Sequence, residues 1–290
     1  MILFCFKAYK LPVLFVSHGA GPCFFMDAPH SPFFSLLDKN SEATKWYMQL
    51  ATQIKTTNAP PNAKDPNQWQ KPKAIIVISA HWETDDEILV TNQKTHKELL
   101  YDYSGFPEHT YKLKYPAKGN PELAQKIVDL AKNSGIKCGF DSTRNFDHGV
   151  FIPLLLMYPA ADIPVVEVSI NSNFNPKFHI EFGRALQPLR EQGVLIIGSG
   201  STTHGSFKST ENFNIFLNSI TDTLTNKDPG DRLSILMNWD KSLPHAREAH
   251  GREDHLIPLH VVIGAAGGDR GHLLNNFSAK ELSLHSFCFT

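Results

Sequence analysis

Histidines follow the ends of hydrophobic runs in this chain. Three short apolar runs are each followed within a few residues by a histidine: Leu11–Val16 by His18, Ala74–Ile78 by His81, and Val194–Ile197 by His204. Neutral imidazole is the commonest ligand of catalytic transition metals and a natural proton carrier near neutral pH. Because the carboxyl ends of parallel strands line one crevice, residues far apart in sequence can meet there. The pattern therefore predicts a metal-centred active site.

The elements that must position these histidines alternate along the chain. Apolar runs rich in Val and Ile, typical of buried parallel strands, predict four strands: Leu11–Val16, Ala74–Ile78, Ile163–Ile170 and Val194–Ile197. Apolar residues at helical spacing predict three helices: Pro121–Lys132, Phe178–Arg190 and Asn212–Thr225. The polar stretches Thr56–Lys73 and Lys227–Asp231 are predicted to be loops. Alternating strands and helices indicate a layered α/β fold, and we expect residues 1–290 to form a single domain.

Composition excludes several classes of function. The 290-residue chain is 41% hydrophobic and 20% charged, as in ordinary soluble proteins, and its net charge of −1 gives no basis for binding nucleic acid or an anionic membrane. Its four cysteines form no CxxC pair, which argues against a disulfide framework or a thiolate zinc site. No apolar run approaches a membrane span, and the apolar Met1–Phe6 is too short for a signal peptide. We expect a soluble cytoplasmic protein.

Taken singly, each histidine has an ordinary structural alternative. His18 could be a buried histidine satisfied by backbone hydrogen bonds, and His81 precedes a tryptophan of the kind that often fills a core. His148 follows Asp147, which could orient the imidazole through its second nitrogen or could cap the following apolar helix. His204 follows the small-residue stretch 198–203, interpreted as a flexible turn, which lacks the lysine of a phosphate-binding P-loop.

The remaining histidines divide into two groups. His255 follows two acidic residues that suit a helix N-terminus, which would project it from the first helical turn. His250 and His260 lie five residues to either side, a spacing that does not place all three on one helix face around one metal. Seven others occur in polar or irregular contexts and are predicted to be solvated: His30, His96, His109, His179, His245, His272 and His285.

Five motifs occur in the order found in the class III extradiol ring-cleavage dioxygenases. They are Ser-His-Gly at 17–19, Ser-Ala-His-Trp at 79–82, Phe-Asp-His-Gly at 146–149, Gly-Ser-Gly at 198–200 with His204, and Glu-Asp-His-Leu-Ile-Pro-Leu at 253–259. The chain is most similar to the 4,5-DOPA dioxygenase-like branch of the LigB family, over nearly its whole length. This resemblance implies a three-layer α/β/α sandwich with a central mixed, mostly parallel sheet.

Matched motif by motif, the resemblance also implies the roles of the histidines. The metal ligands fall on His18, His81 and His255, the acid–base histidine on His204, and a further active-site histidine on His148. The implied cofactor is Fe²⁺. Three neutral imidazoles suit Zn²⁺ equally well, since non-haem iron oxygenases typically use two histidines and a carboxylate. The implied partners are O₂ and a small-molecule catechol, with a DOPA-like catechol as one candidate.

The implied reaction opens a catechol ring beside its diol to give a muconic semialdehyde. A base must remove a catechol proton and an acid must later return one, and a histidine such as His204 suits both tasks. Two alternatives stay open: a zinc-dependent hydrolase that generates hydroxide near neutral pH, and a non-enzymatic binding module similar to the MEMO family. Retention of all five histidines favours the enzyme. The sequence predicts neither the ring substituents nor the oligomeric state.

Overall fold

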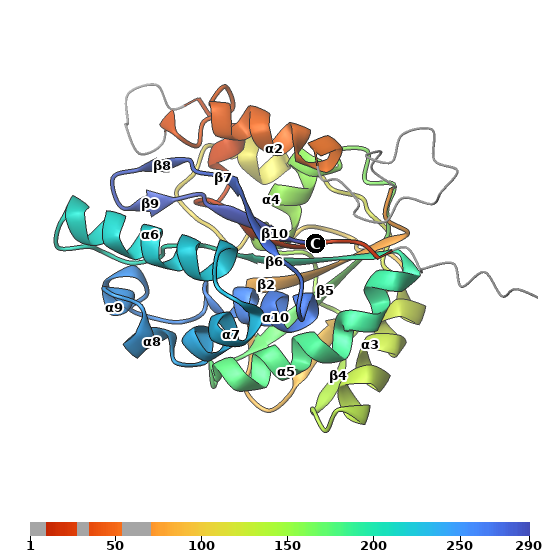
Figure 1. Cartoon of the computed structure of the whole chain (residues 1–290). Helices are drawn as coiled ribbons and strands as arrows, with labels where there is room; N and C mark the ends of the chain where they lie inside the picture. Colours follow the sequence, from red (N-terminus) through yellow and green to blue (C-terminus); the bar gives the residue numbers. More distant parts are fainter. Residues whose placement is uncertain (1–9, 28–34, 54–70) are drawn as a thin grey trace, which may run out of the picture.

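A mixed eight-stranded sheet forms the centre of the computed structural model (Figure 1). The structure describes residues 10–27, 35–53 and 71–290. The strand order is β4-β3-β5-β2-β6-β1-β10-β7. The strands are β1 (Val13–Ser17), β2 (Ala74–Thr84), β3 (Ile88–Thr91), β4 (Cys138–Asp141), β5 (Val165–Asn171), β6 (Val194–Gly200), β7 (Gly271–Asn275) and β10 (Ser286–Phe289). The central strands β5, β2, β6 and β1 are parallel, whereas β10 is antiparallel to both its neighbours and β3 is antiparallel to β5. The predicted mixed, mostly parallel sheet is confirmed.

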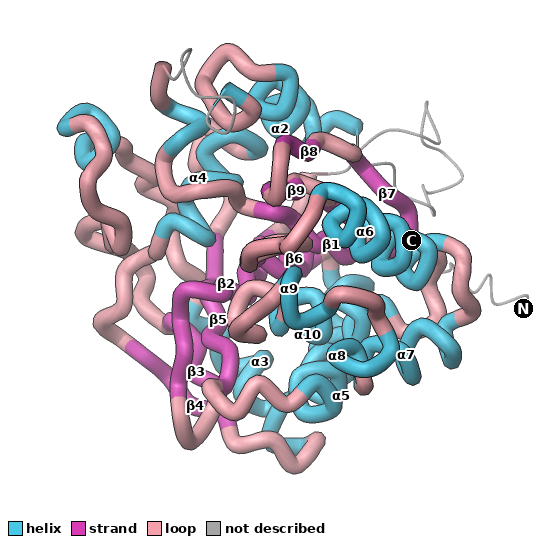
Figure 2. The backbone as a smooth tube through the Cα atoms, turned by 90° about the vertical axis from the view of Figure 1, so that its left-hand side faces the viewer, coloured by secondary structure: helices cyan, strands magenta, loops and turns pink. Residues whose placement is uncertain are grey.

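Helices cover both faces of this sheet. They are α2 (Glu42–Gln53), α3 (Pro121–Asn133), α4 (His148–Met157), α5 (Pro176–Leu186), α6 (Thr210–Thr225), α7 (Pro229–Met237), α8 (Trp239–Ser242), α9 (Ala246–Ala249) and α10 (Ile257–Ala266), with 3₁₀ turns η1 (Cys23–Phe25), η2 (Glu108–Lys112) and η3 (Gln187–Gln192). Figures 1 and 2 show α2 and α4 on one face and α3, α5 and α10 on the other. The predicted three-layer α/β/α arrangement is therefore confirmed.

Two apolar cores lie on opposite faces of the sheet. Along β2, Ile76 and Ile78 join the core beneath α3, α5 and α10, whereas Ile75 and Val77 join the core beneath α2 and α4. Since the central strands are buried on both faces, they read in the sequence as continuous Val- and Ile-rich runs. Helices α4 and α10 are almost entirely buried, which accounts for their apolar character on every side.

Several helices and strands have bounds that differ from the predicted ones. Strand β2 continues six residues past Ile78, so His81 lies within the strand, and the pairing of β2 with β5 shifts register between Ile78 and Glu83. Residues 198–200 belong to β6 and form no turn, and the predicted helix Phe178–Arg190 divides into α5 and η3. Helix α7 begins inside the predicted loop Lys227–Asp231. Most of the predicted loop Thr56–Lys73 lies outside the described residues.

A small hairpin stands apart from the main sheet. Strands β8 (Ser278–Ala279) and β9 (Leu282–Ser283) pair only with each other, and Lys280 in the turn between them has a positive φ of 55°. Among the helices that the structure describes, none has the length and apolar character needed to cross a membrane.

The prediction of solvated side chains is wrong for His179 and His285, which are both buried, and the His179 imidazole, on α5, is fully so. Its Nε2 accepts the backbone N–H of Asn171 at 3.0 Å, and its Nδ1 lies 2.8 Å from the carbonyl oxygen of Asn175. Burial lowers the pKa of His179 to about 3. The neutral ring therefore bridges the end of a strand and the start of a helix.

This contact makes stability depend on pH. His179 is protonated more readily in the unfolded chain than in the folded protein. Its contribution to the free energy of unfolding is therefore complete above about pH 6.5 and is lost as the pH falls toward about 3. We expect His179→Leu to lower the free energy of unfolding at pH 7.5 by about 1–3 kcal/mol, because the Asn171 N–H is left unpaired. Urea unfolding at pH 7.5 and 5 should show a weaker pH dependence in His179→Leu than in wild type. Equal pH dependence in the two proteins would contradict this role, and His272→Leu, at an exposed site, is the control.

Candidate metal centre

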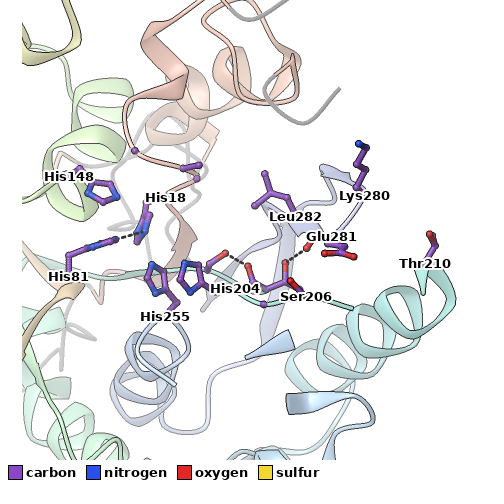
Figure 3. Close-up of a pocket in the computed structure, with 16 residues that line it drawn as sticks. His18, His81, His148, His204, Ser206, Thr210, His255, Lys280, Glu281 and Leu282 are labelled. Atoms are coloured by element: carbon purple, nitrogen blue, oxygen red, sulfur yellow. Dashed lines mark hydrogen bonds between the residues drawn. The ribbon is translucent and has the colours of Figure 1, made fainter. Parts of the chain in front are cut away.

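All five sequence-predicted histidines meet at one cavity of about 870 Å³ (Figure 3). They come from five parts of the chain: His18 follows β1, His81 lies in β2, His148 opens α4, His204 follows β6, and His255 lies in the turn that leads into α10. His255 lies just before the helix and not in its first turn, a small correction to the sequence prediction. The carboxyl ends of the parallel strands thus bring together residues up to 237 positions apart (18 to 255).

Three of these histidines lie close enough to share one ion. The Nε2 atoms of His18 and His81 are 3.1 Å apart, and one ring nitrogen from each of His18, His81 and His255 lies within 4.8 Å of the others. The three ring centroids are separated by 4.9–5.2 Å. His18 and His255 are buried, and His81 is partly buried.

The second nitrogen of each imidazole in this trio faces a polar partner. The Ser199 hydroxyl donates its proton to the carbonyl oxygen of Gly149, so it must accept from His18 Nδ1, 3.0 Å away. Asp254 Oδ2 accepts from His255 Nδ1 at 2.8 Å. His81 Nδ1 lies 3.3 Å from a carboxylate oxygen of Asp102. Each partner favours a proton on Nδ1 and therefore leaves a lone pair on Nε2.

This donor set fits a divalent transition metal. Two facing lone pairs at 3.1 Å repel each other, whereas two nitrogens bound to one metal at about 2.1 Å lie roughly 3.0–3.4 Å apart. Burial, reinforced by the neighbouring histidines, lowers the pKa of His18 well below its usual value and that of His81 to about 3. Both rings are therefore neutral near pH 7, the form that binds metal.

Glycines allow the segments of the trio to approach one another. A Cβ on Gly200 would lie 2.1 Å from the carbonyl oxygen of His255, so only glycine fits there. The same contact region is tied by hydrogen bonds from the His18 N–H to the Gly200 oxygen and from the Ser201 N–H to the His255 oxygen, both 3.0 Å. The interpretation of residues 198–200 as a flexible turn is wrong, because these glycines lie in a buried strand packed against the His255 segment.

His148 is oriented by Asp102, a residue that the sequence analysis missed. Asp102 Oδ1 accepts from both His148 Nδ1, at 2.8 Å, and the His148 backbone N–H, at 3.0 Å. Asp147 instead caps α4, accepting the N–H of Val150. Of the two predicted roles for Asp147, the structure therefore supports the helix cap. The tyrosine-rich context of Asp102 gives no periodic signal that could have identified it.

A buried ionic network lies behind His81. Arg144 donates to Glu167 at 2.9 Å, to Asp147 at 2.7 Å and to the carbonyl oxygen of His81 at 3.1 Å, and its guanidinium covers the ring of Trp82. Burial, followed by the nearby Asp147 carboxylate, raises the pKa of Glu167 well above its usual value. The network fixes both the backbone at His81 and the cap of α4.

His204 lies at the edge of the trio. Its ring stacks on that of His255, with centroids 3.5 Å apart and planes inclined by 13°. The backbone N–H of His204 donates to the carbonyl oxygen of Ala249. Desolvation, followed by the charge of a neighbouring His255, lowers the pKa of His204 to about 4. The neutral ring lines the cavity and is able to accept a proton.

His250 and His260 lie outside the cluster, as their spacing predicts. Both are fully buried, and the Nε2 atom of each faces a backbone carbonyl oxygen, of Thr202 for His250 and of Leu236 for His260.

Comparison with known proteins identifies the family. The model of the catalytic LigB subunit of aromatic ring-opening dioxygenase matches residues 24–287. This chain belongs to the LigB family. The crystal structure of an uncharacterized protein from Escherichia coli K12 matches this LigB-family chain with a TM-score of 0.68 and 26% identity, covering 97% of this chain and 100% of the other.

Curated relatives agree with this assignment. The chain is 40% identical to a 4,5-DOPA dioxygenase extradiol of Beta vulgaris, over 76% of this chain and 84% of the relative. It is 32% identical to a 4,5-DOPA dioxygenase extradiol of Escherichia coli K12, over 69% of this chain and 78% of the relative. The predicted class, a non-haem metal-dependent ring-opening dioxygenase, is confirmed by family. The match favours this class over the hydrolase and binding-module alternatives.

The geometry predicts which histidines the protein needs in order to bind metal. We expect His18→Ala, His81→Ala and His255→Ala each to lose bound metal, with a larger loss of affinity than the about 10–100-fold typical of removing an outer-shell partner. Elemental analysis of each purified variant is the measurement, with His272→Ala, on β7, as the control that keeps metal. Full occupancy in any one variant would remove that residue from the ligand set.

Proposed function

We propose that this LigB-family chain cleaves the ring of a catechol, next to its diol, with O₂ at Fe²⁺ held by His18, His81 and His255. The observation that carries the proposal is the convergence of three imidazoles, with His204 and His148 flanking them at the same cavity. When bound, Fe²⁺ would act as a Lewis acid and a template for both reactants.

His204 is proposed to move the proton. Because its ring is neutral near pH 7, a ring nitrogen of His204 accepts the proton of a catechol hydroxyl and later returns it to the product. The stacking of its ring on His255 supports a role for His204 beside the proposed metal ligands.

His148 is proposed to bind an oxygen atom of the substrate or of O₂. Asp102 engages its Nδ1, so Nε2 is left for this contact. The His81 and His148 ring centroids are 3.9 Å apart, which keeps this second nitrogen close to the proposed ligands.

The substrate is proposed to carry a polar substituent, as a DOPA-like catechol does. The cavity extends from the histidines past Ser206 to Thr210, Lys280 and Glu281 (Figure 3). A catechol at the metal would direct its substituent toward this outer region, where side chains of both charges are present. The names of the plant and bacterial relatives support the same substrate class.

Ring cleavage tests the proposed function directly. We expect the protein, loaded anaerobically with Fe²⁺ and then exposed to air, to consume O₂ and to form a yellow muconic semialdehyde from one or more catechols, DOPA included. Oxygen uptake and absorbance give two independent readouts, and the Zn²⁺-loaded protein is the matched control. Hydrolysis of esters by the Zn²⁺ form, without ring cleavage by the Fe²⁺ form, would favour the hydrolase instead.

Substitution of His204 and substitution of His148 should affect the kinetics differently. We expect His204→Ala to keep its metal and to lose about 10²–10⁴-fold in kcat, because the proton carrier is gone. His148→Ala should also keep metal but raise KM and lower kcat less, since it removes hydrogen bonds to substrate or oxygen. Steady-state kinetics of the iron-loaded variants make the comparison. An unchanged kcat in His204→Ala would refute its role, and metal loss would make it a ligand.

A further inference from the structure

Asp102 reaches two of the site histidines at once. One carboxylate oxygen lies 2.8 Å from His148 Nδ1, and the other lies 3.3 Å from His81 Nδ1. The Asp102 side chain is only 19% exposed, although it belongs to the irregular segment between β3 and η2. No other carboxylate in the described part of the chain contacts both of these rings.

The chemistry of a carboxylate gives both contacts the same consequence. An ionised carboxylate only accepts hydrogen bonds, so it favours a proton on the Nδ1 atom of each ring. The Nε2 of His81 then carries the lone pair that faces His18. Because Nδ1 and Nε2 lie on different sides of an imidazole, Asp102 lies behind His81, away from the space shared by the trio. It supports the proposed ligand without joining the ligand set.

The carboxylate is itself held in place by its neighbours. The hydroxyl of Tyr101 donates to the carbonyl oxygen of Leu113 at 2.6 Å, and that of Tyr103 donates to Thr110 at 2.8 Å. The N–H of Leu100 donates to the carbonyl oxygen of Phe146, two residues before His148. Both sides of Asp102 are therefore anchored, one of them to the segment that leads into α4.

We propose that Asp102 is a positioning residue that holds the imidazoles of His81 and His148 as one unit. A single carboxylate thereby orients both a proposed metal ligand, His81, and the histidine proposed to contact the substrate, His148. The inference rests on the proposed function for the roles of these two histidines. It requires that loss of Asp102 weakens metal binding through His81 and, separately, impairs turnover through His148.

The metal arm of the test needs no substrate. Zn²⁺ affinity is measured by competition with a chromophoric chelator for wild type, Asp102→Asn, Asp102→Ala and Glu98→Gln. An asparagine amide offers one acceptor and turns its NH₂ donors toward the second Nδ1–H, so it cannot satisfy both rings. We expect both Asp102 variants to bind Zn²⁺ about 10–100-fold more weakly. Glu98→Gln removes the same charge from an exposed position four residues away and should bind as wild type does.

The turnover arm separates positioning from a general structural defect. At saturating Fe²⁺, Asp102→Ala should still have a reduced kcat. In the His148→Ala background with Fe²⁺ still saturating, however, adding Asp102→Ala should lower kcat no further, because the histidine through which Asp102 affects turnover is already absent. The same double variant should still bind Zn²⁺ more weakly than His148→Ala alone, through His81.

The results that overturn the inference differ from those that overturn the proposed function. Wild-type Zn²⁺ affinity in both Asp102 variants, or fully additive losses of kcat, would exclude Asp102 as the shared positioning residue.

If wild type cleaves no catechol, the proposed function fails, and the Zn²⁺ arm still tests the contact with His81. The contact with His148 is then tested by NMR of the Zn²⁺-loaded protein. Loss of the hydrogen-bonded Nδ1–H resonance of His148 in Asp102→Ala supports the inference, and its persistence overturns it.

Discussion

An imidazole has two nitrogens, and the centre of this protein depends on engaging one of them so that the other keeps its lone pair. Ser199, Asp102 and Asp254 do this for His18, His81 and His255 respectively, each at Nδ1. Without these partners, the rings could rotate or exchange tautomers, and the Nε2 atoms of His18 and His81, 3.1 Å apart, could share one hydrogen bond instead of each keeping a lone pair. The partners come from three different segments, so the arrangement exists only in the folded chain.

The charged groups buried behind the site hold the backbone that carries His81. An unpaired buried ion is costly, but Arg144 is paired with Asp147 and also contacts Glu167, whose raised pKa favours its neutral form. The guanidinium therefore adds little net charge to the interior. Its remaining hydrogen bond reaches the carbonyl oxygen of His81, within the part of β2 that loses register with β5. An irregular strand, which could move, is held in this way by a cation fixed at three points.

Local hydrophobic patterns could place His18, His81 and His204 after predicted strands, and the motifs shared with the family added His148 and His255. Neither could find the partners of these histidines. His18 and Ser199 are 181 residues apart, and Asp102 and His148 are 46 apart, so no local pattern links them. Local reasoning also failed where one residue type serves two purposes. The glycines at 198 and 200 suggest a flexible turn, but they allow close packing of a buried strand. The polar residues around His179 suggest an exposed side chain, but one of them, Asn175, caps the helix that carries the buried His179 ring.

The cavity has two walls of different construction. The histidines lie on or directly beside central strands and the buried helices α4 and α10, whereas the hairpin of β8 and β9 contributes Lys280, Glu281 and Leu282 to the lining. The hairpin is joined to the histidine wall by Thr203, which donates to the carbonyl oxygen of Glu281 and accepts the N–H of Ser283, both at 3.0 Å. Both bonds use backbone groups of the hairpin, so they survive replacement of the side chains at its tip. Mutations there would change which molecules the cavity admits and leave every imidazole in place, so that selection could alter substrate preference while the reaction chemistry is inherited intact.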